Sequence, residues 1–256
     1  MISLFHAKPK AKPVKKRDGG KGGESLHLAI DGAPVAVKLR LNPRARRVIV
    51  KVDPGTGDVT VVAPSRTGLK HALDFARGEH DWIARQRARV PHQVTLAPGA
   101  KLPFRGQAHE VRHGGVRGPL PAWRDDATSI IWVTGRVEHA PRRIADFLKR
   151  EARALCEASA LEYGARLGVL PARITMRDTA SRWGSCSAAR AVSFSWRLIF
   201  APDFVRDYVV AHEVAHLKEM NHGPRFWTLV EKLHPQFEAA QDWLRVHGRS
   251  LQRYKA

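Results

Sequence analysis

The sequence has little cysteine, few acidic residues and no long apolar segment. Only Cys156 and Cys186 occur in 256 residues, which is too few for a disulfide scaffold or a zinc ribbon with four cysteine ligands. No apolar run approaches the roughly 18 residues that a membrane-spanning helix needs, and the N-terminus holds no apolar stretch of secretory length. We therefore expect a cytoplasmic protein with reduced thiols and no membrane partner.

Acidic residues are outnumbered by basic ones, 24 against 44, which gives a formal net charge of +20. Such an excess favours contact with anionic partners such as nucleic acid, but it equally fits a solvated basic surface. Residues 1–24 hold seven basic and two acidic side chains and show no apolar periodicity. We predict that this segment is a disordered basic tail through which the chain could bind nucleic acid.

Alternating apolar residues predict strands after the tail. The pattern covers residues 26–30, 35–41, 48–52 and 59–63, with turn residues between them, and indicates a small antiparallel sheet. A helical pattern follows Pro64 and runs through Ile83. Three further short strands are expected among glycines and prolines, in residues 93–96, 109–112 and 129–133.

Helical patterns dominate the second half. Pro141 suits the first turn of a long helix and Gly168 suits its end. Strands are expected at 174–177 and 191–200, and three helices after Pro202, Pro224 and Pro235. We therefore predict an α+β fold with three parts: a tail (1–24), a β-rich region with one helix (25–140) and a mixed helix and strand domain (141–256).

The clearest chemical signal is the H-E-x-x-H pattern His212-Glu213-Val214-Ala215-His216. Residues four apart lie on one face of a helix, about 6 Å apart along its axis, so the two imidazoles can bind one zinc ion. The carboxylate of Glu213 then lies beside the metal, where it can take a proton from a water molecule. About 0.03 matches to this pattern are expected by chance in this composition.

A catalytic zinc site needs a third protein ligand, for which Glu219 and His222 are candidates. Glu219 would lie about 10 Å along the same helix from His212, which is too far for a metal already bound by the helix pair. Asn221 could end the helix in a left-handed conformation and let His222 return over the metal, so we favour His222. A metzincin would need glycine in place of Glu219 and a later methionine turn, and the sequence has neither.

At these residues the sequence resembles a known family, the YgjP-like branch of the SprT-like metal-dependent hydrolases. The resemblance rests on Arg182-Trp183-Gly184-Ser185-Cys186-Ser187, on the histidine set, and on Asn221-His222-Gly223 followed by Phe226-Trp227. It implies a zincin-type domain that binds one zinc ion per chain through His212, His216 and His222, with Glu213 as the catalytic acid and base. SprT itself carries a C-terminal zinc ribbon, which two cysteines cannot form.

Residues around the motif have less certain roles. Arg182 could neutralise an anionic substrate group and Trp183 could stack on substrate; alternatively Trp183 is a core residue and Gly184 serves a tight turn. Asp207, Tyr208 and Glu219 are candidates for orienting the imidazoles.

Three functions are compatible with the sequence. The first is a zinc-dependent peptidase acting on a peptide or protein, in which Glu213 handles the proton of a metal-activated water. The second uses the same centre on a small anionic substrate with a phosphoanhydride bond, such as a nucleotide. The third is a nucleic-acid-associated protein that uses its basic surface, a role that would not need Glu213.

Overall fold

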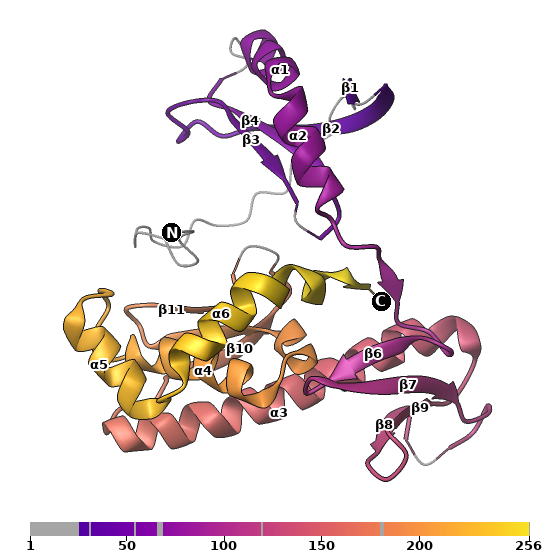
Figure 1. The fold of residues 1–256 in the computed structure, drawn as a ribbon, viewed down its shortest axis with the longest axis vertical. Coiled ribbons are helices and arrows are strands. Elements are labelled where there is room, and N and C mark those ends of the chain that lie inside the picture. Colours follow the sequence, from indigo (N-terminus) through magenta and orange to yellow (C-terminus); the bar gives the residue numbers. More distant parts are fainter. Residues whose placement is uncertain are drawn as a thin grey trace. The chain divides into compact units, whose positions relative to one another are not determined.

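The computed structural model describes residues 26–30, 32–53, 55–65, 69–118, 120–179 and 182–255 (Figure 1). The predicted tail, residues 1–24, lies outside these ranges. The described chain forms two compact units that divide between His92 and Gln93. Each unit has its own cluster of buried apolar residues.

A four-stranded sheet forms the N-terminal unit. Its strands are β1 (Leu26–Ile30), β2 (Ala33–Leu41), β3 (Ile49–Val52) and β4 (Val59–Ala63), in the order β1-β2-β4-β3. The pairs β1–β2 and β3–β4 are antiparallel, but β2 and β4 are parallel. The expected purely antiparallel sheet is therefore wrong at this pair, because the chain passes from β2 to the far edge and returns as a hairpin that inserts β4 between β2 and β3.

Two helices, α1 (Leu69–Gly78) and α2 (His80–Ala88), cover one face of this sheet, where the sequence predicted a single helical stretch. Their Ala76 and Ile83 pack with Leu28, Val37 and Val61. The residues that alternate with this buried set point to the other face of the sheet.

The second unit begins with another four-stranded sheet. Its strands β6 (Lys101–Phe104), β7 (Gln107–His113), β8 (Ala122–Asp125) and β9 (Ile130–Val133) have the order β6-β7-β9-β8. The short β5 (Val94–Thr95) pairs with β13 (Tyr254–Lys255), which ties the start of this unit to its C-terminal end.

The long helix α3 (Ala140–Leu167) follows the one-turn 3-10 helix η1 (Val137–His139) and has the predicted limits, with proline in its first turn and Gly168 at φ 68°. Its Ile144 and Leu148 share one core with Val111 and Ile131 of the preceding sheet. The expected division at residue 140 is therefore wrong, because the sheet and α3 bury their apolar faces against each other.

The remaining elements complete this unit. A three-stranded sheet has the order β10-β12-β11, with strands β10 (Arg173–Arg177), β11 (Gly184–Cys186) and β12 (Ala191–Ser195). The helices are η2 (Trp196–Phe200, 3-10), α4 (Asp203–Ala215), α5 (Pro224–Leu233), α6 (Phe237–His247) and η3 (Gly248–Arg253, 3-10). The fold is thus mixed α+β, as predicted. None of the described helices is both long and apolar enough to cross a membrane.

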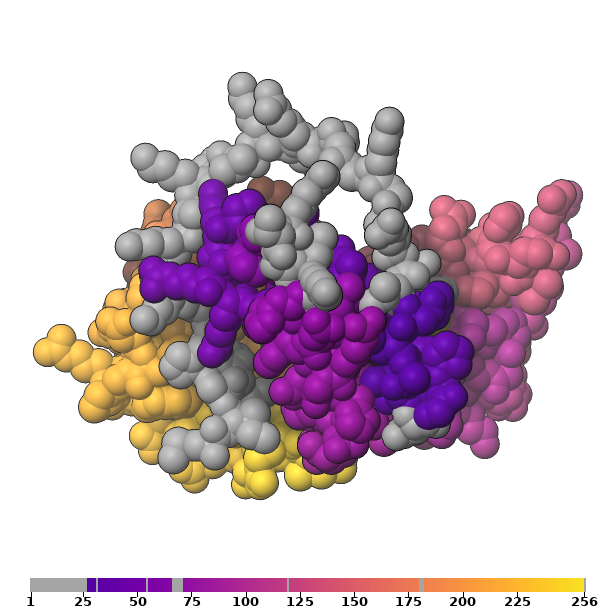
Figure 2. Space-filling view, turned by 90° about the horizontal axis from the view of Figure 1, so that it is seen from above, coloured from indigo at the N-terminus to yellow at the C-terminus, as the bar shows by residue number. Residues whose placement is uncertain are grey.

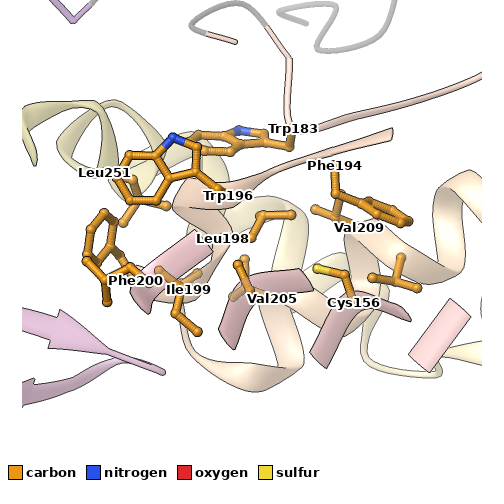
Figure 3. Packing of buried hydrophobic residues seen from close by; sticks show 14 of the residues in the cluster. Cys156, Trp183, Phe194, Trp196, Leu198, Ile199, Phe200, Val205, Val209 and Leu251 are labelled. Atoms are coloured by element: carbon orange, nitrogen blue, oxygen red, sulfur yellow. The ribbon is translucent and has the colours of Figure 1, made fainter. Parts of the chain in front are cut away.

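Helix α4 packs against α3, α5 and α6 in the core of this unit. Cys156 of α3 lies near Val205 and Val209 of α4, and Trp183, Trp196 and Leu251 gather at one end of the same cluster (Figure 3). Residues 196–200, predicted as strand, form the 3-10 helix η2, and all five are buried. The active-site motif is therefore carried by a helix that is packed on several sides.

Candidate metal centre

Helix α4 presents the H-E-x-x-H residues at its C-terminal end. His212 is 0% exposed, Glu213 is 2% exposed and His216 is 8% exposed. These residues are buried because α4 is apolar around most of its circumference and packs against α3, α5 and α6. The two imidazoles and the carboxyl group of the motif are therefore surrounded largely by apolar side chains.

His222 joins the two helical histidines. Helix α4 ends at Ala215, one turn earlier than predicted, and the following turn brings His222 back. Each of the three residues offers a ring nitrogen that lies within 4.8 Å of the other two. The Nε2 atoms of His212 and His222 are 3.1 Å apart. Two nitrogens bound to one tetrahedral zinc at about 2.05 Å are about 3.3 Å apart, so the donor set fits such an ion.

Glu219 contacts the cluster through its backbone. The Nδ1–H of His216 donates to the carbonyl oxygen of Glu219 at 3.0 Å. This bond fixes the tautomer of His216 and leaves its Nε2 lone pair for a metal. The three-histidine group found in the described residues does not include the Glu219 side chain. The conformation of Asn221 differs from the expectation, since its φ is not positive.

Tyr208 lies one turn before His212 on α4. Its hydroxyl oxygen is 3.5 Å from Nδ1 of His212 and accepts a hydrogen bond of 2.9 Å from Nε2 of Gln241. Tyr208 and Glu219 thus contact the imidazoles, as expected of orienting groups. Asp207, the third candidate, instead accepts hydrogen bonds from Ser159 and Arg206.

Aromatic rings enclose the histidines on the side of α5. Phe226 stacks on His216 with ring centroids 4.5 Å apart and meets His212 and His222 edge-on at 4.8 and 4.7 Å. Trp227 lies about one ring further out, at 6.0 Å from His212. Both residues belong to the first turn of α5, which begins directly after Gly223. They hold the imidazole planes in place while also packing the helix.

Burial sets the protonation of the site. It lowers the pKa of His212 well below 6.5, and the neighbouring His216 and His222 add to the shift. Burial also lowers the pKa of His216, although its bond to Glu219 opposes this. Both rings are therefore neutral at pH 7 and present lone pairs to a cation. Burial raises the pKa of Glu213 to about 8, against the opposing charge of Arg182.

Gly184 is a site residue that sequence reasoning missed. A Cβ atom at this position of β11 would lie 2.5 Å from both Cγ and Oε1 of Glu213. Gly184 has no positive φ, so it is required for space and not for the expected tight turn. The signal available in the sequence was a glycine within the Arg182–Ser187 run. In the structure this glycine lies where β11 passes close to helix α4.

The two residues predicted to bind substrate, Arg182 and Trp183, lie in different environments. Trp183 is 7% exposed and belongs to the apolar core, next to Gly248 and Leu251 (Figure 3). The structure therefore places Trp183 in the core and not in a position to stack on substrate. Of the two residues, Arg182 is the exposed one, and its charge acts on Glu213.

The arrangement has the parts of a hydrolytic metal centre. Three convergent imidazoles can hold a divalent cation, and a carboxyl group with a raised pKa lies beside them. The backbone of β11, an edge strand of its sheet, runs past that carboxyl group.

Comparison with known proteins agrees with this geometry. The sequence model of the YgjP-like metallopeptidase domain matches residues 46–247, which is most of the chain. Searches of curated proteins and of solved structures found no match. Family membership implies a metal-dependent hydrolase, in line with the histidine cluster. The chain belongs to the YgjP-like metallopeptidase family.

Proposed function

We propose that this protein is a zinc-dependent peptidase in which Glu213 is the general base and acid. The observation that carries the proposal is the convergence of His212, His216 and His222 within 4.8 Å beside a buried carboxyl group. Imidazole nitrogen is a preferred zinc ligand, and three protein ligands leave a fourth position for water or substrate. The fit of the 3.1 Å nitrogen separation to tetrahedral geometry supports zinc over cations that require six oxygen ligands.

Glu213 supplies the proton transfer. Zinc, when bound, would polarise the scissile carbonyl group and make a water molecule more acidic. The carboxylate of Glu213 takes the proton of the attacking water and then donates it to the nitrogen of the leaving amine. Burial raises the pKa of Glu213 to about 8 in the absence of a cation, and a bound divalent cation would favour the carboxylate form that accepts the proton.

The edge strand β11 supports a peptide as substrate. Its backbone passes close to the side chain of Glu213, and among the described strands β11 pairs with β12 alone. An extended peptide could add to the open edge by backbone hydrogen bonds, which would bring a peptide bond to the site.

The experiment is hydrolysis by zinc-loaded protein of casein and of a panel of nucleoside triphosphates, with Glu213→Gln as the inactive control. Release of peptides by wild type and not by the variant would support the proposal. Casein cleavage that is equal in both proteins and is abolished in both by a chelator would contradict the assignment of Glu213.

The second candidate is hydrolysis of a phosphoanhydride by the same centre. The observation that favours it is Arg182, an exposed cation close enough to act on Glu213. A guanidinium beside a metal centre is suited to a phosphate oxygen. Phosphate release from a nucleotide, abolished by Glu213→Gln and weakened by Arg182→Gln, would select this reaction, whereas an Arg182-independent cleavage of casein would select the peptidase.

A further inference from the structure

The face of the N-terminal sheet that does not pack on α1 and α2 carries exposed basic side chains. Alternation along β2 buries Val35 and Val37 against the helices and exposes Lys38 and Arg40 on the other side. On β3, Ile49 and Lys51 occupy the positions that point to this same face. Long side chains project from the purple part of this unit in the space-filling view (Figure 2).

The strand register sets these side chains in rows. Lys38 of β2 and Lys51 of β3 are both paired with Thr60 of β4, so the three residues lie side by side. Arg40 and Ile49 flank Val62 in the next row. Neighbouring strands are about 4.8 Å apart and alternate residues about 7 Å apart, so the cations of this face are spaced about 7–10 Å from one another at the backbone.

A folded turn extends the basic face beyond β2. The backbone N–H of Asn42 donates to the carbonyl of Ala63 at 2.9 Å, which continues the pairing of β2 with β4. The side-chain oxygen of Asn42 then accepts a bond from the N–H of Arg44 at 3.1 Å. Arg46 and Arg47 follow, and all three arginines are exposed. Three more cations are thus held next to the row of Arg40.

These cations are poorly compensated. Lys38 forms an ion pair with Asp58 at 2.8 Å. Within the part of the chain that the structure describes, Arg40, Arg44, Arg46, Arg47 and Lys51 have no ion-pair partner. Five exposed positive charges therefore lie on this face and in the turn that follows β2, in a unit with fewer than a hundred residues. Such a patch lowers its energy by binding a polyanion and releasing counterions.

We propose that this face, consisting of Lys38, Arg40, Lys51, Thr60 and the turn arginines 44, 46 and 47, binds a nucleic-acid duplex through its phosphates. Residues 26–63 contain no Phe, Trp or Tyr, so the face has no aromatic platform on which unpaired bases could stack. Of the large apolar residues on this face, Ile49 is 36% exposed and Val62 is buried, whereas an interfacial membrane surface presents a continuous apolar face. The phosphate backbone of a duplex is a polyanion that cationic side chains and a hydroxyl group can bind without any aromatic or apolar contact, and these are the groups that this face offers.

The test uses full-length protein and labelled 24-base-pair DNA and RNA duplexes of arbitrary sequence, with the matching single strand as a separate arm. Anisotropy titrations at several salt concentrations give the affinity and its salt dependence. The test variant is Arg40→Gln with Arg47→Gln and Lys51→Gln. The control variant is Arg85→Gln with Arg87→Gln and Arg89→Gln, which removes the same charge from exposed positions at the end of α2, on the other side of the sheet.

The proposal expects the test variant to bind duplex at least about tenfold more weakly near 0.1 M salt, with a salt slope lower by about 2–3, since each lost phosphate contact lowers the slope by about 0.9. The control variant should change affinity by less than about threefold. DNA and RNA duplexes binding alike would indicate that the backbone alone is read, and a preference for one would identify the source. Binding should persist with EDTA and in Glu213→Gln, which separates it from the hydrolase activity.

Several results would overturn the proposal. Equal weakening by both variants would mean that net charge and not this face attracts the duplex. Tighter binding of the single strand, or of vesicles with anionic lipids, would assign the face to another partner. Circular dichroism melting of both variants checks that the sheet remains folded.

Discussion

At the scale of single residues, the centre depends on a carboxyl group held where a carboxylate is costly. Glu213 is almost fully buried, and this burial raises its pKa to about 8. The positive charge of Arg182 opposes this shift. The first prediction tests our proposal that this carboxyl group transfers the proton.

Replacing Glu213 with glutamine should remove turnover while leaving metal binding unchanged. The amide has nearly the same shape and hydrogen-bonding reach, but it cannot accept the proton of water. General base and acid contributions of about 10²–10⁴ predict a loss in rate of at least about a hundredfold. Metal content by mass spectrometry and turnover are measured on the same preparation; near-normal turnover would show that another group takes the proton.

The choice of His222 over Glu219 as third ligand gives a second prediction. His222→Ala should lower zinc affinity by at least about a hundredfold, since even groups that only support a ligand are worth about ten- to a hundredfold. Glu219→Ala should keep one zinc per chain, because Glu219 contacts His216 through its backbone carbonyl and not its side chain. Competition with a chromogenic chelator measures both affinities. Zinc kept by the first variant and lost by the second would reverse the assignment.

Gly184→Ala should slow catalysis without removing the metal. The new Cβ would occupy the space of Cγ and Oε1 of Glu213, so the carboxyl group must move. A displacement of about 1 Å at a reacting group can cost about a hundredfold in rate, and we expect a loss of about ten- to a hundredfold. Gly78→Ala is the matched control, since no atom lies within 4 Å of its added Cβ. An unchanged rate in Gly184→Ala would mean that Glu213 has room to adapt.

At the scale of elements, local signals predicted those that start and stop at distinctive residues. Helix α3 has its predicted limits because proline sets its first turn and Gly168 takes a left-handed conformation at its end. The strands β6, β8 and β11 were not predicted, because each is only three or four residues long, which is too short for an alternating pattern to stand out. Helix α4 ends early at Ala215 because the turn that carries His222 begins there, which no pattern in Leu217–Asn221 indicates.

The packing of α3 on α4 can be tested through Cys156. This thiol lies between the two helices, 0% exposed, and burial raises its pKa to about 12. Since the thiolate is the reactive form, iodoacetamide at pH 8 should modify Cys156 at least about a hundredfold more slowly than a free cysteine. The measurement uses Cys186→Ser, so that only one thiol is counted. Urea at a denaturing concentration should restore ordinary reactivity, and rapid labelling without urea would contradict the burial.

At the scale of the whole molecule, the sequence indicated which elements exist but not which of them share a core. The strands between residues 94 and 133 resemble those of the N-terminal sheet in their pattern, and both groups are β-rich, so the boundary was expected at residue 140. Their assignment follows instead from long-range packing of Val111 and Ile131 on α3, and from the pairing of β5 with β13. Neither contact leaves a signal in a local window of sequence.

The separate cores predict that residues 93–256 fold and bind metal without the N-terminal unit. Every residue of the metal centre lies in this range, and its apolar cluster includes no residue from 26–92. The truncated protein should melt cooperatively and hold one zinc per chain, but it should lose duplex binding with the basic face. A second truncation at residue 141 provides the contrast, since it removes the sheet that packs on α3 and should not fold. Circular dichroism melting, zinc analysis and anisotropy on both fragments give the result. If the fragment 93–256 failed to melt cooperatively, the catalytic unit would depend on the N-terminal unit for its stability.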